Sequence, residues 1–143
     1  MYQTSARNAF FGSLERVRKT PIMTELCLRL RDATELVAMV TTESFERLAV
    51  SEGASLTAMV KAPDILVATE VAQPSRIGAG NRLPGRIDTL THRGVSVEVM
   101  GILENGTPMC ALCTAQSVAD LGLREGDAVW FLFTAFSLIV AAA

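Results

Sequence analysis

Two short stretches of the chain carry groups that could bind an anion. Ser5, Ala6 and Arg7 offer a hydroxyl, backbone N–H groups and a guanidinium, and Lys61, followed by Ala62, adds an ammonium group. A tetrahedral dianion loses water when it is enclosed, so its site must supply fixed donors and offset the charge. This combination of residues therefore indicates a site for an oxyanion.

A second kind of donor is a threonine–serine pair, which occurs as Thr41 with Ser44 and again as Thr114 with Ser117. Each pair stands at the start of a predicted short helix, where backbone N–H groups favour anions. The same residues would serve as helix caps in a protein that binds nothing. Both interpretations stay open on the sequence alone.

The N-terminal residues and the lysine have ordinary structural interpretations as well. Ser5 could be a surface serine and Arg7 a solvated charge, while Lys61 could protect a strand edge from aggregation. Their joint spacing, rather than any one residue, favours anion binding.

These residues belong to an internal repeat. Shifting the sequence by 73 residues aligns Asn8 with Asn81, Gly12 with Gly85, Glu25 with Glu98, Thr41 with Thr114, Ser44 with Ser117 and Gly53 with Gly126. A repeat of this length sets the architecture. We expect features of both halves to maintain the fold, and features of one half alone to be candidates for chemistry. Asn8 and Asn81, present in both, are better explained by a hydrogen bond at the start of a strand than by ligand binding.

The composition limits the possible partners. The hydrophobic fraction is 50% and the mean hydropathy +0.33, so much apolar surface must be buried, and association with copies of the chain would bury it. A net charge of -2 and an aromatic fraction of 6% disfavour nucleic-acid binding and charge-driven membrane binding.

The N-terminal residues are too few and too polar for a signal peptide, so we expect a cytoplasmic protein. The apolar tail, residues 128–143, is predicted to form two strands rather than a membrane span.

Catalytic and metal-binding candidates are weak. Cys110 and Cys113 have CxxC spacing, but residues three apart on a strand point to opposite faces, so we interpret them as core side chains. The lone His92 stands in a polar turn without an obvious partner. We therefore expect a protein that is not an enzyme and has no metal held directly by its side chains.

The pattern of each half predicts five strands with one short helix after the third. The first half is expected to have strands at residues 8–19, 22–31 and 36–40, a helix at residues 41–48, and two closing strands. The second half is expected to have strands at residues 81–90, 95–103 and 109–113, a helix at residues 114–121, and two closing strands. Gly12 suggests a bulge or a bend. This order is typical of the OB-fold. We predict an all-β protein with short helices, made of two tandem five-stranded OB barrels at residues 1–70 and 78–143, joined by a linker at 71–77.

Several of these segments resemble one known family. The run Thr4-Ser5-Ala6-Arg7-Asn8, the later Gly12, the helix start Val40-Thr41-Thr42-Glu43-Ser44 and the strand end Val60-Lys61-Ala62 are similar to the Mop or TOBE domains of molybdate-binding proteins. Two such domains in one chain resemble a di-domain molbindin. The resemblance implies binding of molybdate or tungstate for storage, homeostasis or sensing of molybdenum, without an organic cofactor. It also implies a homotrimer with ligands at subunit interfaces, where the hydroxyl pair comes from a neighbouring domain.

The second half lacks the charged part of this implied site. Gly78 replaces Ser5, Gly80 replaces Arg7 and Thr134 replaces Lys61. Its hydroxyl pair is kept. We therefore expect full-strength sites to combine the charged residues of the first half with a hydroxyl pair from another domain, at a lower occupancy than in a symmetric relative.

A further departure concerns the loop after the first strand. The family usually carries Gly-Ala-Val-Asn-Ala-Glu-Val there. The corresponding residues of this chain, 20–26 and 93–99, lack the asparagine, and Pro21 lacks an N–H.

The alternative to an oxyanion-binding protein is a regulatory or interaction module, not an enzyme, whose anion site is degenerate or lost.

Overall fold

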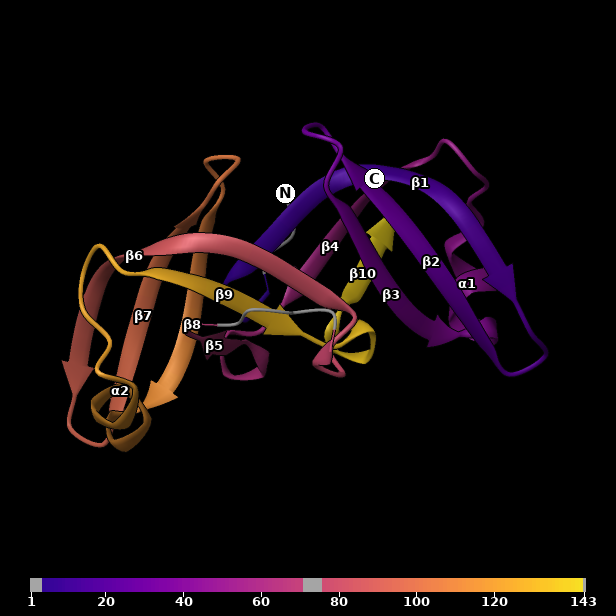
Figure 1. Cartoon of the computed structure of the whole chain (residues 1–143). Coiled ribbons are helices and arrows are strands. Elements are labelled where there is room, and N and C mark those ends of the chain that lie inside the picture. The colour runs from indigo at the N-terminus through magenta and orange to yellow at the C-terminus, as the bar shows by residue number, and fades with distance from the viewer. Residues whose placement is uncertain (1–3, 71–75, 143) are drawn as a thin grey trace. The chain divides into compact units, whose positions relative to one another are not determined.

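The computed structural model describes residues 4–70 and 76–142. It is almost entirely β-structure with two short α-helices (Figure 1). The elements of the first repeat are β1 (Asn8–Lys19), β2 (Met23–Leu30), β3 (Glu35–Thr41), α1 (Thr42–Leu48), β4 (Ser55–Val60), the 3-10 helix η1 (Ala62–Asp64) and β5 (Leu66–Ala68). Those of the second are β6 (Asn81–Arg93), β7 (Ser96–Leu103), β8 (Pro108–Thr114), α2 (Ala115–Leu121), β9 (Ala128–Phe133), the 3-10 helix η3 (Ala135–Ser137) and β10 (Ile139–Ala142).

The described residues form two compact units. Unit 1 contains residues 4–8, 61–70 and 76–133, and unit 2 contains residues 9–60 and 134–142. Each unit has one curled five-stranded sheet, in the order β5-β9-β6-β7-β8 in unit 1 and β10-β4-β1-β2-β3 in unit 2. Five strands and a short helix after the third confirm the predicted all-β, OB-like class.

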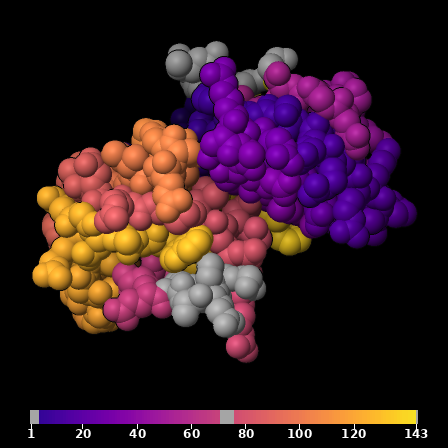
Figure 2. All heavy atoms as spheres, turned by 45° about the horizontal axis from the view of Figure 1, so that its top comes forward, coloured from indigo at the N-terminus to yellow at the C-terminus, as the bar shows by residue number. Residues whose placement is uncertain are grey.

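Each sheet includes a closing strand from the other repeat. In unit 1, β5 pairs with β9, with Ala68 opposite Trp130. In unit 2, β10 pairs with β4, with Ile139 opposite Met59. In Figure 2 the magenta atoms around β5 lie among the yellow and orange atoms of the second repeat. The boundaries 1–70 and 78–143 thus describe the repeat in the sequence, whereas the compact units exchange their closing strands.

The exchange has a simple physical reason. A repeated sequence creates two equivalent sheet edges, so a short apolar closing strand can pair with either. The path is set by the turn before the strand, where Pro63 lies in η1 and the N–H of Ile65 donates to Ala62 O at 3.2 Å. Most of the predicted linker, residues 71–75, lies outside the described residues.

The long first strand of each repeat bends at equivalent positions. The β1–β2 register shifts between Leu14 and Arg16, and the β6–β7 register shifts in the same way one repeat later. The predicted bulge therefore lies just after Gly12 rather than at it. Gly12 has a different role, because a Cβ there would lie 2.6 Å from the carbonyl oxygen of Arg29 on the paired strand.

The two helices begin as the sequence predicts. The Thr41 hydroxyl accepts the Ser44 N–H at 3.1 Å, and the Thr114 hydroxyl accepts the Ser117 N–H at 3.0 Å. Both helices end at a residue in the left-handed region, Gly122 in α2. The helix-cap interpretation of both hydroxyl pairs is therefore confirmed, and it does not exclude a second role.

The core consists of inward-facing apolar side chains of each curled sheet. The largest of these fully buried side chains are Ile87, Val97, Met109, Phe131, Leu132 and Phe133 in unit 1 and Leu14, Leu26, Leu28, Leu36, Leu56 and Val60 in unit 2. The apolar tail forms β9, η3 and β10, as predicted, and the described residues include no helix long and apolar enough to cross a membrane.

Candidate functional site

The N-terminal residues are fixed to unit 1 by Asn8. Its side-chain amide donates to the carbonyl of Cys110 at 2.9 Å and accepts the Cys110 N–H at 2.7 Å. Asn8 is only 2% exposed, so both bonds form away from water. The asparagine thus acts as a backbone clamp on β8, which confirms the structural role expected for it. This clamp sets where the residues before it lie.

Arg7 is held by the neighbouring strand β7. Its guanidinium Nη1 lies 3.1 Å from Glu98 Oε1, and Arg93 Nε reaches the same oxygen at 3.3 Å. The guanidinium of Arg7 is therefore already engaged by a carboxylate. What remains available around this residue is the backbone N–H of Arg7 and the exposed Ser5 hydroxyl. The N–H of Ala6 donates to the Thr4 hydroxyl at 3.1 Å.

Lys61 belongs to the same unit. It precedes η1, which packs against β8, the strand that Asn8 clamps. Ala62 is buried at 5% exposure, while the Lys61 side chain is exposed and forms no ion pair with any described residue. Asn8 and η1, which are far apart in the sequence, thus both contact β8 of unit 1.

The hydroxyl pairs lie at the ends of β8 and β3. The Thr114 hydroxyl donates to Ser117 Oγ at 2.9 Å, and the Thr41 hydroxyl donates to Ser44 Oγ at 2.7 Å. All four side chains are exposed. Along β8, Thr114 is four residues from the clamped Cys110, a separation of about 13 Å at the usual rise of a strand. The Asn8 clamp and the hydroxyl pair of unit 1 thus lie at different points of β8.

Unit 2 contains a third threonine–serine pair, which we did not anticipate from the sequence. Thr134, at the position equivalent to Lys61, has its hydroxyl 3.0 Å from Ser137 Oγ in η3, and η3 packs against β3. The signal was available, because Thr and Ser are three residues apart in all three pairs. Gly78 and Gly80 are exposed and bring no charge. The described part of the second half thus has hydroxyls, but no cation, at the equivalents of the charged residues.

Exposed apolar side chains stand next to both hydroxyl pairs. Ile22 is 76% exposed and Val95, its repeat equivalent, is 87% exposed. The carbonyl of Ile22 accepts the Thr42 N–H at 2.8 Å, and the carbonyl of Val95 accepts the Ala115 N–H at the same distance. Each β-hairpin tip is therefore tied to the start of the helix that carries the hydroxyls. Such a surface is suited to being covered by another protein surface.

The cysteines behave as core residues. Cys110 and Cys27 are buried, Cys113 is half-buried, and all three are free thiols. Burial raises the pKa of each thiol above its ordinary value, so the reactive thiolate is disfavoured. The interpretation of Cys110 and Cys113 as core side chains agrees with this burial.

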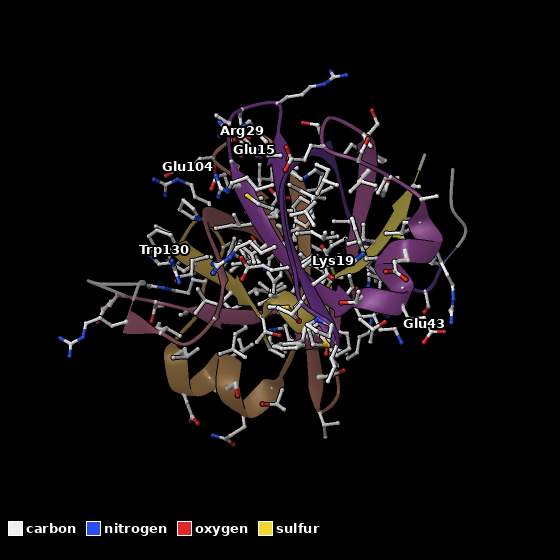
Figure 3. All side chains as sticks on the ribbon, turned by 90° about the vertical axis from the view of Figure 1, so that its right-hand side faces the viewer. Glu15, Lys19, Arg29, Glu43, Glu104 and Trp130 are labelled. Carbon is white, nitrogen blue, oxygen red and sulfur yellow. The ribbon has the colours of Figure 1, made fainter. Side chains whose placement is uncertain are left out.

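One group of potential metal ligands is already neutralised. Ligand atoms of Glu15, Cys27 and Glu35 lie within 4.8 Å of one another. However, Arg29 Nη2 lies 2.6 Å from Glu15 and 3.1 Å from Glu35, and Arg16 lies 3.5 Å from Glu35. Figure 3 shows Glu15 and Arg29 together at one end of the sheet. The two guanidinium groups balance the two carboxylates, so this is an ion-pair cluster on the surface of unit 2.

Comparison with known proteins gives a consistent result. The family model of the TOBE domain matches residues 4–67 and again residues 78–140. The transcriptional regulator ModE of Yersinia pestis is 34% identical over 141 residues, which are 97% of this chain and 52% of that protein. The molybdenum-pterin-binding protein MopA of Rhodobacter capsulatus is 32% identical over 139 residues, with the same two shares. The chain thus spans about half the length of the curated relatives it matches.

A solved structure matches over the whole length. The cytoplasmic molybdate-binding protein ModG, in a crystal form with molybdate bound, has a TM-score of 0.93 and 31% identity, and the match covers 99% of this chain and 100% of that one. Two matched domains in tandem, with the strand order described above, show that the chain belongs to the TOBE domain family, in the di-domain arrangement of molbindins.

Proposed function

We propose that this protein binds molybdate or tungstate as an intact oxyanion and performs no catalysis. The observation that supports the proposal is that Asn8, which ends the N-terminal run, and η1, which follows Lys61, both contact β8 of unit 1. These groups supply donors and one uncompensated cation, which a tetrahedral dianion needs. Molybdate in the ModG crystal structure supports this choice of ligand.

Ser5, Ala6 and Arg7 contribute through the serine hydroxyl and backbone N–H groups, and Lys61 and Ala62 add the charge and a further stretch of backbone. The Arg7 side chain acts differently from a direct ligand. Because Glu98 holds it, it keeps the preceding backbone in place and leaves the charge compensation to Lys61.

The remaining donors come from another copy of the chain. The resemblance to molbindins implies that the hydroxyl pair reaches the ligand from a neighbouring domain. An apolar side chain is exposed beside each hydroxyl pair, and burying it against another copy of the chain would be favourable. A homotrimer, with Thr41 and Ser44 or Thr114 and Ser117 facing a neighbour's charged residues, satisfies both requirements.

Calorimetric titration with molybdate, tungstate and sulfate tests this function. Lys61→Met should weaken molybdate binding by about tenfold or more, because a charge-assisted hydrogen bond is lost. Thr134→Val, the change at the equivalent position of the second half, should leave the strong sites intact. Equal effects of the two variants would contradict the proposed site.

The alternative, an interaction module that has lost its anion site, is distinguished by thermal unfolding. A binder gains about 2.7 kcal/mol of stability when the ligand is present at 100 times its dissociation constant, whereas the module gains none. We further propose a cytoplasmic role in storage, homeostasis or sensing of molybdenum. The ModE relatives are transcriptional regulators about twice as long as this chain, and we propose that this chain acts without contacting nucleic acid.

A further inference from the structure

Unit 1 contains a large groove that the anion site does not use. It has a volume of about 870 Å³ and lies where β6, the end of β7 and the start of β9 meet. Its floor includes the buried side chains of Leu103 and Val129. The wall includes Trp130, the one tryptophan of the chain, and Ile102, which is 45% exposed. The volume falls within the range of sites for small molecules, about 300–1,000 Å³.

The rim of the groove carries more negative than positive charge. Glu70, Asp88 and Glu104 all line it, and none of them forms an ion pair with a described residue. Arg86 adds one positive charge to the lining, and its guanidinium donates to the carbonyl of Gly126 at 3.1 Å. Figure 3 shows Glu104 and Trp130 at the same edge of this unit. An aromatic wall with unpaired carboxylates is complementary to a cation that carries N–H donors.

The other repeat has the equivalent groove with the opposite character. In unit 2 it has a volume of about 370 Å³ and includes Arg29 and Arg31 at the positions of Ile102 and Glu104. Thr57 stands at the position of Trp130 and is buried at 7% exposure. The fold is therefore made without the tryptophan or the acidic rim. The acidic rim and the tryptophan are therefore specific to unit 1.

We propose that the groove of unit 1 binds a small organic cation of the amidinium or guanidinium class. The flat cation contacts the indole of Trp130, and its N–H groups donate to the carboxylate of Glu104, while Asp88 adds negative charge further along the groove. A basic side chain of a second copy has the same chemistry, but it would fill only part of a groove of this volume. A free small molecule is therefore the occupant we propose. This inference does not depend on the oxyanion site.

Trp130 provides a direct signal for the test. Benzamidine, neutral benzamide and anionic benzoate have nearly the same shape and differ in charge, so their titration by tryptophan fluorescence separates charge recognition from apolar binding. We expect saturable binding of benzamidine, at least about tenfold weaker binding of benzamide, and no binding of benzoate. Equal binding of benzamidine and benzamide, or no saturable binding of benzamidine, would overturn the proposal.

Variants locate the site. Glu104→Gln should weaken benzamidine by about tenfold and Asp88→Asn by a smaller factor, whereas Glu43→Gln, which removes the same charge from α1, should have no effect. Molybdate affinity should stay unchanged in all three, which separates this site from the oxyanion site. Acrylamide quenching of Trp130 tests the alternative occupant. If Trp130 is shielded in the ligand-free protein and becomes exposed only when the oligomer is diluted, a second copy occupies the groove, which would contradict the proposal of a free small molecule.

Discussion

The first and second halves of the chain form equivalent strands but carry different charges at equivalent places. The N-terminal run and Lys61 give the first half a cation and donors, and the second half has glycines and a third threonine–serine pair instead. The two grooves also differ in charge. The groove of unit 1 is lined by three carboxylates and a tryptophan, whereas the groove of unit 2 is lined by two arginines. The comparison teaches that one strand plan accommodates different charges at equivalent places, because the strand pairing depends on a small set of shared residues.

The largest effect should come from the shared residue Asn8. Asn8→Ala leaves a buried N–H and a buried carbonyl of Cys110 without their partner, so the free energy of unfolding should fall by about 2–4 kcal/mol. Asn81, which is 1% exposed, should be similarly sensitive to alanine. Urea denaturation measures both, with Ser5→Ala as the control expected to change little. If Asn8→Ala leaves the free energy of unfolding unchanged, the hydrogen bonds between Asn8 and Cys110 do not stabilise the fold.

Substituting the shared glycines Gly12 and Gly85 should lower the free energy of unfolding by less than Asn8→Ala does, and by similar amounts for the two glycines. A Cβ at Gly12 would meet the carbonyl oxygen of Arg29 at 2.6 Å, and one at Gly85 would meet that of Ile102 at 2.7 Å. Each glycine-to-alanine change should destabilise the protein by about 1–3 kcal/mol. Gly78→Ala, where nothing lies within 4 Å, is the control. A large difference between the first two variants would show that the halves are less equivalent than their registers indicate.

The smallest effect concerns the ion-pair cluster, which only the first half has. The hydrogen bond from Arg29 lowers the pKa of Glu15 below its ordinary value of 4.5. A carboxyl with a lowered folded-state pKa adds stability above its unfolded pKa and loses it as the pH falls through the folded pKa. Glu15→Gln should therefore make the stability less sensitive to acid below about pH 4.5, by a small amount because the group is exposed.

Chemical denaturation at neutral and acidic pH measures this difference. Asp88→Asn, at the equivalent place in the second half, should leave the acid response unchanged, since Asp88 pairs with no described basic residue. An equal response of the two variants would mean that the cluster contributes nothing specific.

Much of the fold could be predicted from the sequence because local signals agreed in two copies. The helix starts at Thr41 and Thr114 follow from capping chemistry, and the strands follow from their alternation. The exchange of β5 and β10 could not be predicted, because a repeat makes the two sheet edges equivalent to a closing strand. Pairing across equivalent edges depends on tertiary geometry that no local pattern encodes.

The candidate site was predictable only in its components. The spacing of Ser5, Arg7 and Lys61 indicated an anion site, but the engagement of Arg7 by Glu98 depends on strand register. The pair Thr134 and Ser137 could have been found by searching for the same Thr-x-x-Ser spacing as in the two helix starts. The acidic groove draws residues from three strands, so it becomes visible only in the folded unit.

The central claim is that the charged residues of the first half alone make strong oxyanion sites. Calorimetric titration of the purified oligomer with molybdate measures the number of tight sites per chain. We predict one tight site per chain, lost in Lys61→Met and unchanged in Thr134→Val. Two tight sites of equal affinity per chain would show that the uncharged half binds as well, and would contradict the account.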